Sequence, residues 1–139
     1  MQILLVEDNP ADIRLTREAL REGRFQNHLT IVTDGEEALD FLYGRGKFVR
    51  APRPDLVLLD LNLPKKDGRE VLQIVKNDPQ LRRIPVIVLT TSKAERDVTG
   101  AYDQHANAFI SKPLDFDDFV RVISAIEGFC FDTARLPRT

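Results

Sequence analysis

The stretch that decides the fold is LVLLD, residues 56–60, a short apolar run that ends on an aspartate. Three further runs share this design, because each is short and apolar and stops at a polar residue. Uninterrupted apolar runs of this length are typical of strands that are buried on both faces of a parallel sheet. The three runs are Ile3-Leu4-Leu5-Val6 before Glu7-Asp8, Val86-Ile87-Val88-Leu89 before Thr90, and Phe109-Ile110-Ser111 before Lys112 and Pro113.

Segments with helical periodicity lie between these runs, so the chain is predicted to repeat a strand–helix unit five times. This alternation favours a parallel sheet with helices on both faces. Right-handed crossovers leave few strand orders, and 2-1-3-4-5 is common for a chain of this length. We therefore predict a doubly wound, flavodoxin-like α/β fold. The expected strands are 3–6, 28–33, 55–60, 85–90 and 107–111, and the expected helices are 10–23, 36–43, 69–77, 93–104 and 115–130.

Length and composition narrow the function classes. The 139 residues suit one domain, and 42% hydrophobic residues suffice for one core. A net charge of −2 gives no reason to expect binding to nucleic acid. The single cysteine, Cys130, fits a reducing compartment, and no apolar stretch approaches the roughly 18 residues of a membrane span. Because Met1-Gln2-Ile3 leads directly into a strand, we expect a cytoplasmic protein without a signal peptide or membrane partner.

Polar side chains of several kinds are predicted to meet at one edge of the sheet, since the carboxyl ends of parallel strands lie together. Glu7, Asp8 and Asp60 would repel one another there unless a cation neutralised them or a pKa rose. Carboxylates suit Mg²⁺, with Mn²⁺ as a second option. A carboxylate can also attack phosphorus, while Lys112 neutralises phosphoryl oxygens and the Thr90 hydroxyl binds one of them. The edge is therefore predicted to hold a divalent cation and a phosphoryl group.

On these residues the chain resembles the receiver domain of two-component response regulators over essentially its whole length. Glu7-Asp8 matches the acidic pair of that family, and Asp60 is followed by Pro64 and Gly68 at the family's spacing. Lys112-Pro113 matches the end of the fifth strand. The resemblance implies that a histidine kinase or phosphotransfer protein phosphorylates the aspartate at position 60. It assigns the receiver domain to residues 1–131 and a C-terminal tail to residues 132–139.

The resemblance also implies individual roles. Asp8, Asp60 and the backbone carbonyl of Asn62 would bind Mg²⁺, and Glu7 would act on the metal through water. The peptide bond that precedes Pro113 would be cis. Thr90 and Lys112 would contact the phosphoryl group. Thr90 and Phe109 would move together as a conformational switch. Asn62 and Ser92 would tune the lifetime of the phosphate.

A closer resemblance is to single-domain regulators that are partnered with phytochrome-type histidine kinases. The features that carry it are the long loop Gly44–Pro54, Leu61-Asn62-Leu63-Pro64, Thr90-Thr91-Ser92-Lys93, and Asp115-Phe116-Asp117-Asp118-Phe119. Regulators of this group tend to form homodimers through the fifth strand and the last helix. Val122 and Phe129 lie seven residues apart, off the expected core-facing stripe of that helix, and would supply an apolar surface for this contact.

Two other function classes fit parts of the pattern. A Mg²⁺-dependent phosphohydrolase would also use an aspartate nucleophile, but it typically needs a second aspartate where this chain has Asn62. A flavodoxin-type electron carrier would share the strand order. It would need a hydroxyl- and glycine-rich phosphate loop after the first strand, where this chain has the acidic Glu7-Asp8-Asn9-Pro10. The receiver interpretation accounts for all the polar strand ends.

Overall fold

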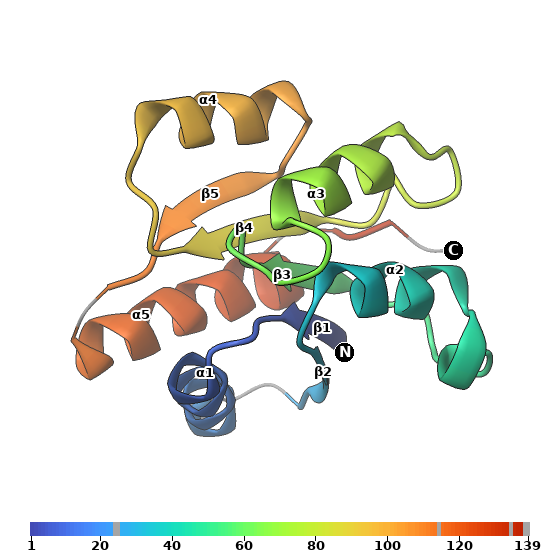
Figure 1. Cartoon of the computed structure of the whole chain (residues 1–139). Coiled ribbons are helices and arrows are strands. Elements are labelled where there is room, and N and C mark those ends of the chain that lie inside the picture. The colour runs from blue at the N-terminus through green and yellow to red at the C-terminus, as the bar shows by residue number, and fades with distance from the viewer. Residues whose placement is uncertain (24–25, 114, 134, 138–139) are drawn as a thin grey trace.

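The structure is a computed structural model that describes residues 1–23, 26–113, 115–133 and 135–137 (Figure 1). Strands and helices alternate along the chain, as the sequence predicts. The strands are β1 (Gln2–Val6), β2 (His28–Val32), β3 (Leu56–Leu59), β4 (Val86–Thr90) and β5 (Ala108–Ser111). The helices are α1 (Pro10–Glu22), α2 (Gly35–Tyr43), α3 (Gly68–Asn77), α4 (Glu95–Asp103) and α5 (Phe116–Glu127), with a short 3₁₀ helix at Gly46–Phe48 and a π-helix at Gly128–Thr133.

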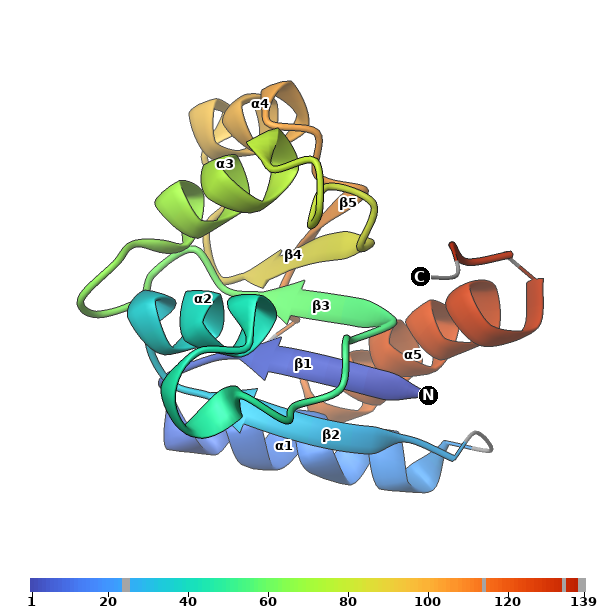
Figure 2. The ribbon, with the colours of Figure 1, turned by 90° about the vertical axis from the view of Figure 1, so that its right-hand side faces the viewer.

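The five strands form one parallel sheet in the order β2-β1-β3-β4-β5, which confirms the predicted topology. Helices α1 and α5 cover one face, and α2, α3 and α4 cover the other (Figure 2). Alternate residues of each strand point to opposite faces, so β1 sends Ile3 and Leu5 into the core beside α1 and α5. Leu4 and Val6 enter the core on the opposite face. The apolar runs lack polar alternation because both faces of the sheet are buried.

Local signals begin the helices close to the predicted positions. The Asn9 side chain accepts hydrogen bonds from the backbone N–H groups of the second and third residues of α1, at 2.9 and 3.1 Å. Asp34 accepts from the N–H of Glu37 at 2.7 Å at the start of α2, and Gly44 ends that helix in the left-handed conformation with φ 66°. The last helix differs from the prediction, since its α-helical part ends at Glu127 and the π-helix follows.

The end of α1 packs against a buried acid of α5. Glu127 is 1% exposed, and its Oε2 accepts a hydrogen bond from the Asn27 side-chain amide at 2.7 Å. Burial raises the pKa of the Glu127 carboxyl. A Cβ atom at Gly23 would lie 2.1 Å from the second carboxyl oxygen of Glu127. The absence of a side chain at Gly23 therefore makes room for the acid at this junction.

The C-terminal segment continues past the predicted domain boundary at residue 131, because the π-helix extends to Thr133. Cys130 is buried against the core beside α1 and α5, whereas the Phe129 side chain is 63% exposed. The boundary between residues 131 and 132 stays a prediction. None of the helices in the described part of the chain has the length and apolar composition that a membrane crossing requires.

Candidate functional site

Backbone pairing continues one residue beyond the strands and brings the predicted site residues to one edge of the sheet. The N–H of Asp60 donates to the carbonyl of the last residue of β1 at 3.0 Å, and the N–H of Glu7 donates to the last residue of β2 at 3.0 Å. The N–H of Lys112 donates to the carbonyl of Thr90 at 2.7 Å. Hydrogen bonds to a neighbouring strand therefore fix the backbone of each of these three residues.

Three carboxylates converge at this edge, as predicted. Glu7, Asp8 and Asp60 each offer one oxygen, and these oxygens all lie within 4.8 Å of one another. Glu7 and Asp60 are buried, whereas Asp8 is exposed and reachable from solvent. Hard oxygen donors of this kind fit Mg²⁺ or a similar divalent cation. Asn62 lies beside the cluster, because its backbone N–H donates to Asp60 Oδ1 at 3.2 Å. No contact tests the metal-binding role that is predicted for its backbone carbonyl.

Lys112 reaches into the centre of the acidic cluster. Its side chain is only 4% exposed, and its ammonium contacts Glu7, Asp12 at 2.9 Å and Asp60 at 3.2 Å. Asp12 is not among the site residues that the sequence predicts. Its only signal is an acid in the first turn of α1, which ordinarily indicates favourable interaction with the helix dipole. One buried cation thus binds three carboxylates from three different segments.

The pKa values of the two buried acids, Glu7 and Asp60, shift in opposite directions. Burial raises the pKa of Glu7 to about 7 and outweighs its bonding to Lys112. Burial also acts to raise the pKa of Asp60, but the charge of Lys112 and a hydrogen bond with Glu7 outweigh it and lower that pKa. Burial acts to lower the pKa of Lys112, whereas its hydrogen bonds to Glu7 and Asp12 raise it. At neutral pH Asp60 is therefore ionised and Lys112 is charged.

Thr90 lies at the same edge with no exposed surface. Its hydroxyl oxygen accepts from the N–H of Ser92 at 3.4 Å, and the Ser92 hydroxyl donates to Asp97 at 2.5 Å. Arg69 of α3 bonds the same Asp97 carboxylate at 3.0 Å. Asp97 and Arg69 are not predicted from the sequence, because they lie 28 residues apart and share no motif. We name this chain of contacts the Ser92–Asp97–Arg69 link.

Phe109, the second predicted switch residue, is half-buried and packs against the core beneath α2, α3 and α4. It pairs with Val88 across β4 and β5. Since Thr90 lies two residues beyond Val88, Thr90 and Phe109 point to the same face of the sheet. The Tyr102 hydroxyl accepts a hydrogen bond from the backbone N–H of Phe109 at 3.2 Å. The geometry therefore places the two predicted switch side chains on the same face, while their joint movement stays a prediction.

The predicted cis bond before Pro113 is wrong. The described residues include both Lys112 and Pro113 and contain no cis peptide bond, so this bond is trans. The prediction depended on family resemblance alone. An X–Pro bond differs by only about 0.5–1 kcal/mol between its two isomers, so the residue types do not by themselves decide the isomer.

Gly68 packs directly against the backbone at Asp60 and Leu61, just after β3. A Cβ atom at this position would lie 2.1 Å from the carbonyl oxygen of Asp60 and 2.7 Å from the Cα of Leu61. The N–H of Gly68 donates to the carbonyl of Leu61 at 3.0 Å. The glycine that follows Asp60 at a fixed spacing is thus required by close backbone approach.

Comparison with known proteins agrees with this geometry. The family described as the response regulator receiver domain matches residues 3–124. The response regulator Rcp1 of Synechocystis sp. is 48% identical over 135 residues, which cover 97% of this chain and 92% of Rcp1.

Two solved structures are similar over nearly the whole chain. The phosphorylated cyanobacterial phytochrome response regulator RcpA superposes with a TM-score of 0.95 at 50% identity, covering 99% of this chain and 98% of RcpA. The Mn²⁺-bound form of Rcp1 superposes with a TM-score of 0.93 at 47% identity, covering 99% of both chains. These matches favour neither the phosphohydrolase nor the flavodoxin alternative.

Proposed function

Because the chain belongs to the response regulator receiver domain family, we propose that it is a single-domain response regulator that accepts a phosphoryl group on Asp60 from a histidine kinase. It is not a conventional enzyme, since its own side chain is the acceptor. The observation that carries the proposal is the buried Asp60 carboxylate, with the Lys112 ammonium at 3.2 Å. Lys112 lowers the pKa of Asp60, and the ionised carboxylate is the form that attacks phosphorus.

In this reaction an Asp60 oxygen forms a bond to the phosphorus of a phosphohistidine as the phosphorus–nitrogen bond breaks. The imidazole nitrogen keeps the electron pair of that bond and takes a proton from solvent. Lys112 neutralises charge on the phosphoryl oxygens, and the Thr90 hydroxyl donates a hydrogen bond to one of them. These groups perform positioning and charge neutralisation, which account for most of the catalysis of phosphoryl transfer.

The acidic cluster supports Mg²⁺ as the cofactor, with Mn²⁺ as a second option because the similar protein Rcp1 has a Mn²⁺-bound form. Asp8, Asp60 and the carbonyl of Asn62 would hold the cation, and Glu7 would act through a bound water. When bound, the metal supplies positive charge that offsets repulsion between the carboxylates and the incoming phosphoryl group. Exposed Asp8 offers the route of entry from solvent.

We assign the output of this site to a conformational switch. Thr90 and Phe109 would move together when the phosphoryl group draws the Thr90 hydroxyl toward it. Asn62 and Ser92 would set the phosphate lifetime, because they lie at the two positions that tune access of water in the family. Both are small and polar, so we expect the phosphate to be lost over minutes rather than days.

Similarity to RcpA, a phytochrome response regulator, supports a phytochrome-type histidine kinase as the partner. A test would compare phosphotransfer from a phytochrome-type kinase and from an unrelated histidine kinase. Faster transfer from the phytochrome-type kinase is expected. Equal or slower transfer would refute this pathway without affecting the role of Asp60.

We also propose a homodimer through β5 and α5. Strand β5 lies at an edge of the sheet, and Phe129, just after α5, is 63% exposed. Light scattering after size-exclusion chromatography should give a dimer mass for the wild type and a lower mass for Phe129→Ser. Val49→Ser is the control, since Val49 is 71% exposed away from this surface. A wild type that stays monomeric at every concentration would contradict the proposal.

The phosphoacceptor is tested by incubating the protein with acetyl phosphate and Mg²⁺ and measuring the intact mass. The wild type should gain one phosphoryl group, whereas Asp60→Asn should not, and EDTA should abolish the gain. Asp67→Asn is a matched control, because Asp67 lies seven residues away and caps α3 instead of joining the acidic cluster. An unphosphorylated wild type that binds Mg²⁺ would overturn the assignment of Asp60.

A further inference from the structure

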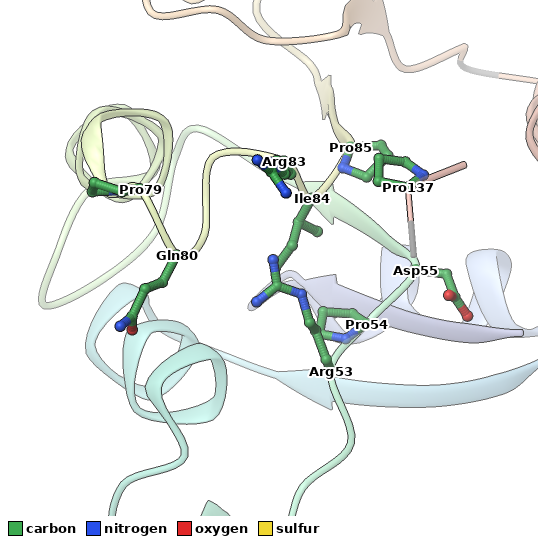
Figure 3. Close-up of a pocket in the computed structure, with 9 residues that line it drawn as sticks. All are labelled: Arg53, Pro54, Asp55, Pro79, Gln80, Arg83, Ile84, Pro85 and Pro137. Carbon is green, nitrogen blue, oxygen red and sulfur yellow. The ribbon is translucent and has the colours of Figure 1, made fainter. Parts of the chain in front are cut away.

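A second candidate binding site lies at the end of the sheet opposite to Asp60. It is a cavity of about 630 Å³ between the segment that leads into β3 and the segment that joins α3 to β4. Arg53 and Asp55 belong to the first segment, and Gln80 and Arg83 belong to the second (Figure 3). Four prolines, including Pro137 of the C-terminal segment, complete the wall. Its volume falls in the usual range of about 300–1,000 Å³ for small-molecule sites.

The two arginines of this cavity are unpaired in the part of the chain that the structure describes. Arg53 lines the cavity from the first segment and Arg83 from the second (Figure 3), and neither forms an ion pair there. By contrast, Arg69 and Arg121 each bind a carboxylate. The Nε atom of Arg53 is buried and has no hydrogen-bond partner among the described residues. A buried N–H without an acceptor is costly, but Nε is shielded from the cavity, so a ligand there would accept from the terminal guanidinium nitrogens of Arg53.

The one acid of the cavity wall does not neutralise these arginines. Asp55 Oδ2 accepts a hydrogen bond from the backbone N–H of Gln2 at 2.8 Å, and its carboxylate points away from both guanidinium groups (Figure 3). The buried ammonium of Lys76 lies behind the second wall, where it donates to the carbonyls of Arg82 at 3.0 Å and Ile84 at 2.8 Å. The cavity therefore has a net positive charge.

Hydrogen bonds hold both walls in place before any ligand arrives. Asp78 accepts from the backbone N–H of Gln80 at 2.7 Å and from the Tyr43 hydroxyl at 2.5 Å. Lys76 anchors the turn that carries Arg83. On the opposite wall, the N–H of Asp55 donates to the carbonyl of residue 2 at 2.7 Å. A cavity whose walls are already fixed loses little freedom when it binds a ligand.

We propose that this cavity binds a small anionic molecule through its phosphate or carboxylate group, held between Arg53 and Arg83. Planar guanidinium groups match both kinds of anion with paired N–H donors. Gln80 and the proline walls can contact an organic part of the ligand. This site is separate from Asp60 and does not depend on the proposed phosphorylation.

The test uses the full chain in EDTA, so that no metal assists binding at the acidic cluster. Isothermal titration with inorganic phosphate, citrate and AMP measures affinity, and NMR spectra of the arginine Nε–H groups locate the ligand. Saturable binding of at least one probe, with a shift of the Arg53 signal, is expected. Tighter binding of phosphate and AMP identifies a phosphate site, and tighter binding of citrate identifies a carboxylate site.

Two variants, one on each wall of the cavity, ensure that a local structural change at one wall cannot explain both results. Arg53→Gln and Arg83→Gln should each weaken the best probe by about tenfold or more, with thermal unfolding confirming that both fold. Arg82→Gln is the matched control, because Arg82 carries the same charge on the same turn but does not line the cavity. Absence of saturable binding by all three probes, or an equal loss in Arg82→Gln, would overturn the proposal.

Discussion

Replacing Gly68 by alanine should damage the protein far more than one added methyl group ordinarily does. The new Cβ would lie 2.1 Å from the Asp60 carbonyl oxygen, whereas ordinary contact begins at 3.4 Å. The backbone would have to open by about 1.3 Å, because the obstacle is main chain rather than a flexible side chain. Strain of this kind costs about 1–3 kcal/mol, and weakening the bond from Gly68 to Leu61 adds about 1 kcal/mol. We expect a total loss of about 2–4 kcal/mol.

Urea unfolding monitored by circular dichroism measures this loss, and Gly100→Ala supplies a control of opposite sign. Gly100 is exposed within α4, and nothing lies within 4 Å of a Cβ built there. Alanine should therefore stabilise the protein by about 0.5–1 kcal/mol at that position. Phosphorylation of Gly68→Ala by acetyl phosphate should also slow, since the strand end that carries Asp60 is displaced. A Gly68→Ala protein within about 0.5 kcal/mol of the wild type would show that the backbone around Asp60 accepts the methyl group at little cost.

Three further predictions concern charged side chains. Lys112→Met should lower the free energy of unfolding by about 3–5 kcal/mol in EDTA, because three carboxylates lose their common cation. Saturating Mg²⁺ should restore part of the loss, and urea titrations with no difference between EDTA and Mg²⁺ would contradict this account. Asp97→Asn should weaken the Ser92–Asp97–Arg69 link at a cost of about 0.5–1 kcal/mol, since Arg69 is partly exposed. Hydrogen exchange should then speed up in the loop after β4, and unchanged exchange would count against the link. Burial lowers the pKa of Lys76 to about 8 from its ordinary 10.5. Between pH 8 and 10.5 the Lys76 amine is therefore mostly protonated in the unfolded chain and mostly neutral in the folded protein. The free energy of unfolding should therefore rise by up to about 3 kcal/mol from pH 8 to 10.5. Urea titrations across this range should show no such rise for Lys76→Met. A rise of the same size in that variant would exclude Lys76 as its source.

The sequence predicts those parts of the site that strand ends determine. Glu7, Asp60 and Lys112 follow apolar runs, and the pairing of parallel strands brings such positions to one edge. Asp12 and Asp97 could not be found in this way, because they lie on helices. Their contacts depend on the rotation and distance of each helix relative to the sheet, which helical periodicity does not specify.

The predicted elements agree most closely where apolar pattern and capping signal coincide. The sequence predicts the first helix over 10–23, and it occupies Pro10–Glu22, between the Asn9 cap and Gly23. The sequence predicts that the last helix reaches residue 130, since its apolar periodicity continues that far. The change to a π-helix at Gly128 alters the hydrogen-bond pattern while Cys130 remains buried. A hydrophobic pattern reports burial more directly than the type of helix that achieves it.

The close fit between Gly23 and Glu127 links the residue types that related sequences should carry at these two positions. A relative with a side chain at position 23 would need a shorter residue at 127, or a different path for the carboxyl group, because a Cβ atom at position 23 would lie 2.1 Å from a Glu127 carboxyl oxygen. Conversely, retention of the acid should coincide with retention of the glycine. The pair would then change together during evolution, and an alignment of relatives should show co-variation between residues 104 positions apart in the chain.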